Sequence, residues 1–226
     1  MGKYNIYIIC KTEEEFIEKS EEINKKYKSK ICHIQWIPAE YLKLTQCNKK
    51  LLKDLNTRYN TDKKKIIAKL GNIAAHRKAL LAVYMNKTDN NIILESDATL
   101  SETLPTPPKI SCYMGGWIVP PQITNAGKVK VNIQPKKGLN KINYDKFNIL
   151  MTHSLFIKTF EESIELFQTT IVDSIKNYDI HLKDLQFFKE YYYPPIFVQG
   201  NHVSEIDNVS NNNNKRSHLY GLTMKI

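Results

Sequence analysis

The sequence contains no apolar run long enough for a membrane-spanning helix. Such a helix needs about 20 consecutive apolar residues, whereas the apolar runs of this chain, among them YNIYIIC and NNIIL, stop well short of that length. No basic segment followed by an apolar stretch and a small-residue cleavage site opens the chain, so the sequence predicts no secretory signal peptide. We therefore expect a cytoplasmic protein without a transmembrane segment.

Cysteine is scarce, and its spacing does not fit the common zinc motifs. The four cysteines are Cys10, Cys32, Cys47 and Cys112, and no two of them form a C-x-x-C pair, which zinc-binding sequences usually contain. Cys10 and Cys32 lie in apolar runs, where buried thiols are typical. The pattern favours a protein of a reducing compartment.

Acidic residues are too few to balance the basic ones, and the net charge is +10. A positive surface attracts phosphates, nucleic acid or an anionic membrane. The lysines are spread along the whole chain, however, and Lys, Asn and Ile are abundant throughout, as in proteins of AT-rich genomes. Because neither a clustered basic helix nor an aromatic RNA-binding strand motif is evident, we expect no nucleic-acid partner. A phosphate-bearing substrate suits the charge.

The first hundred residues alternate between strand and helix patterns. Tyr4–Cys10 and Ile31–Ile37 are short runs rich in β-branched and aromatic residues, which is typical of buried strands. Thr12, followed by three glutamates, predicts the start of a helix between them. The patterns that follow are a helix from about Thr61-Asp62 to Asn86 and a strand at Asn90–Leu94. This order predicts an α/β fold with a Rossmann-like, mostly parallel central sheet flanked by helices.

The second half of the chain mixes strand and helix patterns. We expect strands at Ile110–Pro120 (with a Gly-Gly break), Val129–Ile133 and Ile149–Ile157, and helices at Thr159–Phe167, Thr170–Ile175 and Leu182–Tyr191. Residues 208–216 are rich in Asn and basic residues, which predicts a flexible loop. No internal repeat divides the chain, and its length of 226 residues suits one domain.

The sharpest chemical signal is IILESDAT, in which an apolar strand ends in Glu95 and Asp97. Ligands of α/β sheets collect at the carboxyl ends of strands, and residues i and i+2 of an extended segment point the same way. The two carboxylates would therefore face one cation, Mg²⁺ or Mn²⁺, which prefers hard oxygen ligands and shares them with phosphates. That cation would stabilise charge on a departing diphosphate. A solvated strand end, with Asp97 starting a turn, is the alternative interpretation.

The run KLGNIAAHRKALLAVY…NNIILESDAT resembles the glycosyltransferases of family 25, which include lipopolysaccharide and procollagen galactosyltransferases and related enzymes of large DNA viruses. Those enzymes have a G-x-(I/L)-(G/A)-C-x-x-S-H-like helical segment and, further on, a hydrophobic strand that ends in E-D-D. The residues that match the first segment are Gly71, Ile73, Ala74 and His76, with a shorter Gly-to-His spacing. Glu95 and Asp97 match the outer carboxylates of the second segment, and Ser96 replaces its middle Asp.

Two later segments extend the resemblance, which spans roughly residues 65–206. THSLFIKT (Thr152–Thr159) is similar to the family's strand-then-helix segment beside the donor sugar, and YPPIFVQGNHVSEI (Tyr193–Ile206) to its closing P-x-(I/L)-x-x-Q…S-(D/E)-I segment. The resemblance implies one GT-A domain over residues 1–226, with a nucleotide-binding half (1–100) and an acceptor-binding half (101–226). The AT-rich residue usage also suits a large DNA virus, in which case the compartment would be the host cytoplasm.

By the same resemblance, Glu95 would lie near the nucleotide ribose and Asp97 would bind the metal. A histidine from near the carboxyl terminus often completes such a metal site, and His202 is the first candidate and His218 the second. A neutral imidazole ligand favours Mn²⁺ over Mg²⁺. The implied reaction moves a sugar from a nucleotide diphosphate donor, expected to be a UDP-sugar, to a hydroxyl of a glycan or glycoprotein.

Several further residues are candidates for contacts to the donor. Lys69 and Arg77 suit the pyrophosphate through charge-assisted bonds, Gly71 would let the backbone approach the nucleotide, and Gly116 and His153 suit the sugar. The remaining candidates are Lys11 and Thr12 after the first strand, His76 beside the phosphates, and Ser96 between the carboxylates. Thr12 as a helix cap, His153 as a core residue and the lysines as solvated surface cations are the alternatives.

An inverting enzyme also needs a carboxylate that takes the proton of the acceptor hydroxyl. The candidates for this catalytic base are Asp173, Asp179 and Asp184, of which Asp179 and Asp184 fit the family's pattern best. A retaining enzyme needs no such base, and the sequence leaves both outcomes open. Two other functions also stay open: a metal-dependent nucleotidyltransferase or phosphohydrolase, which usually needs further acidic ligands, and a basic nucleic-acid-binding module.

Overall fold

The computed structural model describes residues 2–39, 53, 57, 63–119, 133–150, 152–170 and 177–200. Its helices are α1 (Glu13–Tyr27), α3 (Lys63–Asn86), α4 (Phe160–Thr169) and α5 (Tyr178–Leu185), with a 3-10 turn at Lys28–Lys30. Its strands are β1 (Tyr4–Cys10), β2 (Ile31–Pro38), β3 (Asn91–Glu95), β4 (Ala98–Leu100), β5 (Cys112–Tyr113), β6 (Trp117–Val119), β7 (Gly138–Lys141), β8 (Asn148–Leu150), β9 (Ser154–Ile157), β10 (Glu190–Tyr193) and β11 (Phe197–Gln199).

A seven-stranded sheet in the order β2-β1-β3-β9-β5-β10-β7 forms the centre of the described structure. Strands β2, β1 and β3 are parallel, β9 runs against its neighbours β3 and β5, and β7 runs against β10. Strands β4 and β11 form one antiparallel pair beside this sheet, and β6 and β8 form another. The expected α/β class is confirmed, with a mixed central sheet in which β2, β1 and β3 are parallel.

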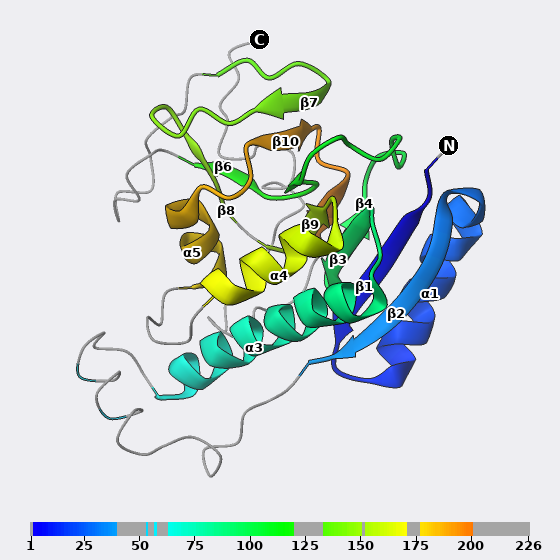
Figure 1. Ribbon diagram of the computed structural model, residues 1–226, viewed down its shortest axis with the longest axis horizontal. Coiled ribbons are helices and arrows are strands. Elements are labelled where there is room, and N and C mark those ends of the chain that lie inside the picture. Colours follow the sequence, from blue (N-terminus) through cyan, green and yellow to red (C-terminus); the bar gives the residue numbers. More distant parts are fainter. Residues whose placement is uncertain are drawn as a thin grey trace.

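Helices cover both faces of the sheet (Figure 1). On one face, Tyr7 and Ile9 of β1 pack with α3, α4 and α5, and on the other face Ile6 and Ile8 pack with α1 through Ile23. Alternate residues of a strand point to opposite faces, so β1, which is buried along its whole length, needs side chains that suit burial on both faces. Six of the seven residues of YNIYIIC are apolar or aromatic, and the exception, Asn5, donates a hydrogen bond to the carbonyl oxygen of Asp89 at 2.8 Å.

The first helix begins where the sequence predicts. Thr12 is the N-cap of α1, and its Oγ1 accepts a hydrogen bond from the backbone N–H of Glu15 at 3.2 Å. The Glu15 carboxylate accepts in return from the backbone N–H of Lys11 at 3.0 Å. This arrangement satisfies one backbone donor of the first helical turn and the backbone donor of the residue before the cap. The expected strand at Ile31–Ile37 is confirmed as β2, one residue longer. The expected buried position of Cys32 is wrong, because Cys32 is exposed, while Cys10 is buried.

Two expected elements in the second half are wrong. Ile149–Ile157 is not one strand, because its first part pairs with β6 as β8 and its last part joins the central sheet as β9. Leu182–Tyr191 is not one helix: α5 ends at Leu185, Gln186 adopts a left-handed conformation with φ 48°, and Glu190–Tyr193 forms β10. Strand β10 pairs with β5 on one side and with β7 on the other. The aromatic residues of that run favour such a strand over a helix.

The other predicted elements are partly confirmed, and some lie outside the described residues. The segment Ile110–Pro120 contains two strands, β5 and β6, separated at the expected Gly-Gly break. The short strands β4 and β7 were not foreseen. The expectations for Thr61-Asp62, most of Val129–Ile133, most of Thr170–Ile175 and residues 208–216 lie outside the described residues. Within the part of the chain that the structure describes, no helix has the length and apolar character needed to cross a membrane.

Gly115 lies at a close approach of two segments and gives a test of this packing. A Cβ atom added there would lie 2.4 Å from Nε2 of His153 and 2.5 Å from the backbone oxygen of Phe197. We expect Gly115→Ala to lower the free energy of unfolding by about 1–3 kcal/mol, the usual cost of overpacking. Urea titration measures this loss.

Gly2→Ala is the matched control, because its added Cβ would meet only side-chain atoms at 3.6 Å. We expect it to leave the unfolding midpoint unchanged. Equal stability of the Gly115 variant and the wild type would contradict the packing described for His153 and Phe197.

Candidate functional site

The two acidic residues of the IILESDAT segment lie at the carboxyl end of β3, in the middle of the sheet. Glu95 is the last residue of β3 and lies opposite Ile9 of the parallel strand β1. Ser96 and Asp97 form a turn, and Ala98 then begins β4. The carboxyl ends of parallel strands are where α/β sheets bind ligands. Because Ser96 and Asp97 turn rather than continue the strand, the extended backbone expected between the two carboxylates is wrong, and the carboxylates have different partners.

Glu95 is held by side chains from two other parts of the fold. Its Oε1 accepts hydrogen bonds from Nδ2 of Asn72 at 3.2 Å and from Oγ1 of Thr152 at 2.9 Å, and it lies 2.8 Å from Nε2 of His76. Its backbone N–H donates to the carbonyl oxygen of His153 at 3.0 Å. Helix α3 and the segment between β8 and β9 are therefore joined at one carboxylate oxygen.

The surroundings of Glu95 keep its carboxylate ionised. Burial raises the pKa, but the hydrogen bond and charge of His76, with smaller contributions from His153 and Thr152, outweigh it and lower the pKa of Glu95 from 4.5 to about 2. An ionised carboxylate only accepts hydrogen bonds, so Nε2 of His76 carries the proton and donates. The His76 side chain is fully buried, whereas Glu95 keeps 22% of its side chain exposed.

Asp97 is held on the other side of the turn, by β11. Nε2 of Gln199 donates to Oδ2 of Asp97 at 2.8 Å, and the backbone N–H of Gly200 donates to the Asp97 carbonyl oxygen at 2.7 Å. Gln199 also pairs with Ala98 in the β4–β11 ladder. The side chain and the backbone of Asp97 are therefore fixed by β11 and by Gly200, the residue that follows it.

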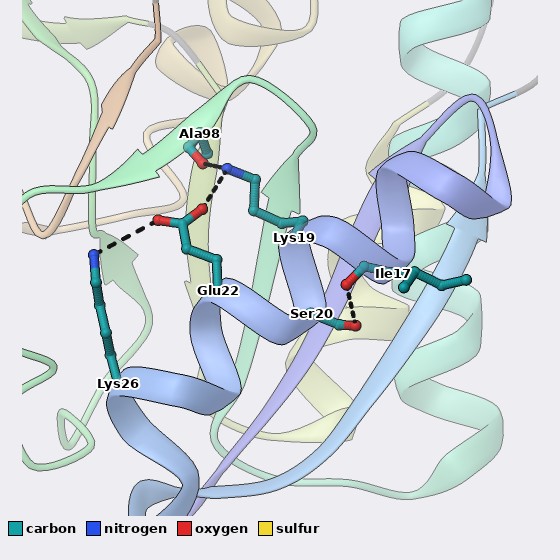
Figure 2. A network of polar contacts seen from close by, with 6 residues as sticks. All are labelled: Ile17, Lys19, Ser20, Glu22, Lys26 and Ala98. Carbon is teal, nitrogen blue, oxygen red and sulfur yellow. Dashed lines mark hydrogen bonds and ion pairs between the residues drawn. The ribbon is translucent and has the colours of Figure 1, made fainter.

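Helix α1 supports the same turn from beneath β4 (Figure 2). Nζ of Lys19 donates to the carbonyl oxygen of Ala98 at 2.8 Å and lies 3.2 Å from Glu22, whose other oxygen is 3.7 Å from Lys26. The Lys19 side chain is only 16% exposed, so this contact is better sheltered from water than an ordinary surface ion pair. It connects the first helix to the residue that follows Asp97.

One of the expected catalytic bases lies near this network and the other does not. The His76 ring packs on the ring of Tyr178, with centroids 4.4 Å apart, and Tyr178 is the first residue of α5. Asp179 follows directly, whereas Asp184 is exposed at the far end of α5, with its carboxylate 2.9 Å from Nζ of Lys183. Five residues along a helix turn through about 500°, so the two aspartates also point to different sides.

Arg77 and His153 have structural partners. The Arg77 guanidinium donates to the carbonyl oxygens of Phe167 and Thr170 at the end of α4 and lies 3.9 Å above the Phe167 ring. Nε2 of His153, which is almost fully buried, donates to the carbonyl oxygen of Phe197 at 3.2 Å. These contacts place Arg77 against the end of α4 and His153 in the core, the alternative interpretation for His153, and the expected contacts of both residues to the donor stay predictions.

The remaining candidates are placed as follows. Lys69 shares a face of α3 with Asn72 and His76, because the three residues are three and four positions apart. Gly71 lies inside α3 next to Asn72, and Gly116 has φ 135° immediately before β6. Thr12 serves as the helix cap, the alternative interpretation, and Lys11 is exposed beside it at the carboxyl end of β1. The metal-ligand candidates His202 and His218, and the base candidate Asp173, lie outside the described residues.

The network contains residues that sequence reasoning missed. Asn72, Thr152 and Gln199 contact the two carboxylates directly, and Lys19 contacts the turn. Asn72 had a detectable signal, because it lies four positions before His76 and therefore shares its helix face. The other three are brought to the turn by contacts between distant segments. Among the residues that the structure describes, no cluster of three His, Cys, Asp or Glu side chains forms a ready metal site.

Comparison of this chain with models of known protein families and with curated protein sequences found no match. The geometry around Glu95 and Asp97, together with the resemblance of the motifs, is therefore the basis for a functional proposal.

The lowered pKa of Glu95 predicts a pH-dependent contribution to stability. Because the pKa is lower in the folded than in the unfolded chain, the stabilisation is complete above pH 4.5 and is lost as the pH falls toward about 2. We expect Glu95→Gln to be less stable than the wild type at neutral pH by about 1.5–3 kcal/mol, the usual value for hydrogen bonds to a charged group. Urea titrations at a series of pH values measure both curves.

The difference in the free energy of unfolding between the wild type and Glu95→Gln should become smaller as the pH falls from 4.5 toward about 2. The reason is that the wild-type carboxyl takes up its proton over this range. Asp184→Asn, which removes an exposed carboxylate, is the control for a general effect of charge. If the free energy of unfolding varies with pH in the same way for Glu95→Gln and the wild type, Glu95 is not held as an anion.

Proposed function

We propose that this chain is an enzyme that binds a nucleotide diphosphate through a divalent cation at the carboxyl edge of its central sheet. One observation carries the proposal: a buried parallel strand ends in an ionised carboxylate, Glu95, and a second carboxylate, Asp97, follows on a turn that β11 and α1 hold in position. Two fixed carboxylates at this edge of a sheet repel a diphosphate unless a cation lies between them.

Within that class, we propose a glycosyltransferase of the GT-A type. The support comes from the segments that resemble family 25, which lie far apart in the sequence. His76 and Thr152, from two of these segments, both bond to Glu95 of the carboxylate segment, and Gln199, from the last segment, bonds to Asp97. Motifs that are matched independently along the chain therefore contact one another at a single turn, as the parts of one binding site must.

The residues at the turn fit the expected cation. Carboxylate oxygens are the ligands that Mg²⁺ and Mn²⁺ prefer, and Asp97 would hold the ion with one of them. Because Oε1 of Glu95 is already engaged by three side chains, Glu95 would act through its charge and through the ribose. His202 would add a nitrogen ligand and favour Mn²⁺. The bound cation would supply charge stabilisation for the departing diphosphate.

The other parts of the site would orient the two substrates. Lys69, on the same face of α3 as Asn72 and His76, suits the diphosphate through a charge-assisted bond. Asp179 would take the proton of the acceptor hydroxyl if the reaction inverts configuration. The expected donor is a UDP-sugar and the expected acceptor a glycan or glycoprotein hydroxyl.

Binding of UDP with Mn²⁺ is the first test. A ligand at 100 times its dissociation constant stabilises a fold by about 2.7 kcal/mol, so we expect the thermal midpoint of the wild type to rise when UDP and MnCl₂ are added together. Asp97→Asn keeps the shape of the side chain and removes its charge, and we expect it to abolish the rise. Differential scanning fluorimetry measures both.

Asp184→Asn is the matched control, because it removes one negative charge from the surface of α5, and we expect it to respond as the wild type does. If UDP with Mn²⁺ leaves the thermal midpoint of the wild type unchanged and an oligonucleotide raises it, the proposed enzyme is wrong and a nucleic-acid-binding function takes its place.

The second test compares the two expected bases. General base catalysis contributes about 10²- to 10⁴-fold to a rate, so an inverting enzyme should lose that factor in Asp179→Asn and keep its full rate in Asp184→Asn. The measurement is the rate at which each variant releases UDP from a set of UDP-sugars in the presence of an acceptor. Full activity of both variants would exclude Asp179 as the base and favour retention of configuration.

A further inference from the structure

One hydrogen bond fixes the side-chain amide of Gln199, and the amide oxygen has no hydrogen-bond partner among the described residues. Its Nε2 donates to Oδ2 of Asp97 at 2.8 Å. A carboxylate only accepts hydrogen bonds, so this contact identifies which end of the amide is nitrogen and which is oxygen. The amide oxygen Oε1 therefore points away from Asp97, and its direction is set by the same bond.

Oε1 of Gln199 is buried and has no hydrogen-bond partner among the described residues. A buried amide oxygen without a donor is unfavourable, and natural proteins rarely leave one unless a water, an ion or a ligand supplies the donor. The backbone leaves this residue little freedom to relieve the cost, because Gln199 pairs with Ala98 and the next N–H donates to the Asp97 carbonyl oxygen. The missing donor should therefore come from outside the described chain.

We propose that Oε1 of Gln199 accepts a hydrogen bond from an O–H group of the bound donor complex, either a water on the cation or a hydroxyl of the sugar. This inference rests on the proposed function, since it takes the ligand of Asp97 to be a metal–nucleotide-sugar complex. Gln199 then acts twice, as the residue that positions Asp97 and as a contact that distinguishes one donor from another.

The chemistry of the pair supports an O–H donor over a second cation contact. Gln199 and Asp97 already share one hydrogen bond, and the amide oxygen is neutral, which suits a neutral donor group. A site with a buried acceptor also discriminates strongly, because a ligand that lacks the matching O–H leaves the acceptor unpaired. The sugar specificity of this chain would then depend in part on one amide of β11.

The experiment measures dissociation constants by isothermal titration calorimetry on the full chain with MnCl₂. The probes are UDP, UDP-glucose and UDP-galactose, and the variants are Gln199→Met, which keeps the length of the side chain without its polar atoms, and Gln199→Ala. Gln35→Met is the matched control, because Gln35 also lies on a strand and accepts a side-chain hydrogen bond, from Asn86 at 2.7 Å, far along α3 from His76. The thermal midpoint of each variant without ligand reports its folding.

We expect Gln199→Met to weaken binding by about three- to tenfold, the usual effect of losing a neutral hydrogen bond, and Gln35→Met to leave it unchanged. Both variants also remove the hydrogen bond from Nε2 to Asp97, which would weaken the binding of all three probes through the cation. A larger loss for a UDP-sugar than for UDP therefore identifies a sugar hydroxyl as the donor, and an equal loss for all three probes excludes the hydroxyl and leaves the cation-bound water. Gln199→Ala should repeat the result if Gln199→Met folds poorly.

Failure of the role of Gln199 and failure of the proposed function give different results in this experiment. If the wild type binds UDP with Mn²⁺ and folded Gln199 variants bind every probe equally well, the role of Gln199 is wrong and the proposed function stands. If the wild type binds none of the probes, both proposals are wrong.

Discussion

Three hydrogen bonds to a single oxygen, Oε1 of Glu95, determine how the parts of this site meet. Asn72 and His76 come from one face of α3, and Thr152 comes from the segment between β8 and β9. The anionic form of Glu95 suits these donors, and the donors in turn keep the pKa of the carboxyl low. With fewer donors, burial would raise the pKa of this carboxyl, so the geometry of the turn and the pKa of Glu95 depend on each other.

The turn after Glu95 is held from the opposite direction by elements that do not contact α3 at this point. β11 binds the Asp97 side chain, Gly200 after it binds the Asp97 backbone, and α1 binds the next carbonyl oxygen through Lys19. Sites that bind a metal and a charged ligand need side chains whose own positions are fixed by surrounding contacts. Here the two carboxylates are fixed by separate sets of neighbours, so a substitution on one side should leave the other carboxylate in position.

Elements specified by neighbouring residues were predicted well, and those specified by distant pairing were not. The run at Tyr4–Cys10, the cap at Thr12 and the strand before Glu95 depend on local patterns, and each is confirmed. The segment Ile149–Ile157 contains no proline or glycine, yet it divides between two sheets, because its first part pairs with β6 and its last part with β3 and β5. The partners of Glu95 and Asp97 were missed for the same reason, since Thr152 and Gln199 lie 57 and 102 positions away from the carboxylates that they contact.

The position of Glu95 also bears on the expected division of the chain into a nucleotide-binding and an acceptor-binding half. Glu95 belongs to the first half by sequence, but it shares its oxygen with Thr152 of the second half, and His76 packs on Tyr178, the residue before Asp179. His76 and Tyr178, which are both buried, therefore connect Glu95 to the residue before Asp179 through direct packing. Any shift of Glu95 on cation binding would reach α5 through direct packing, because close-packed side chains have little room to move independently.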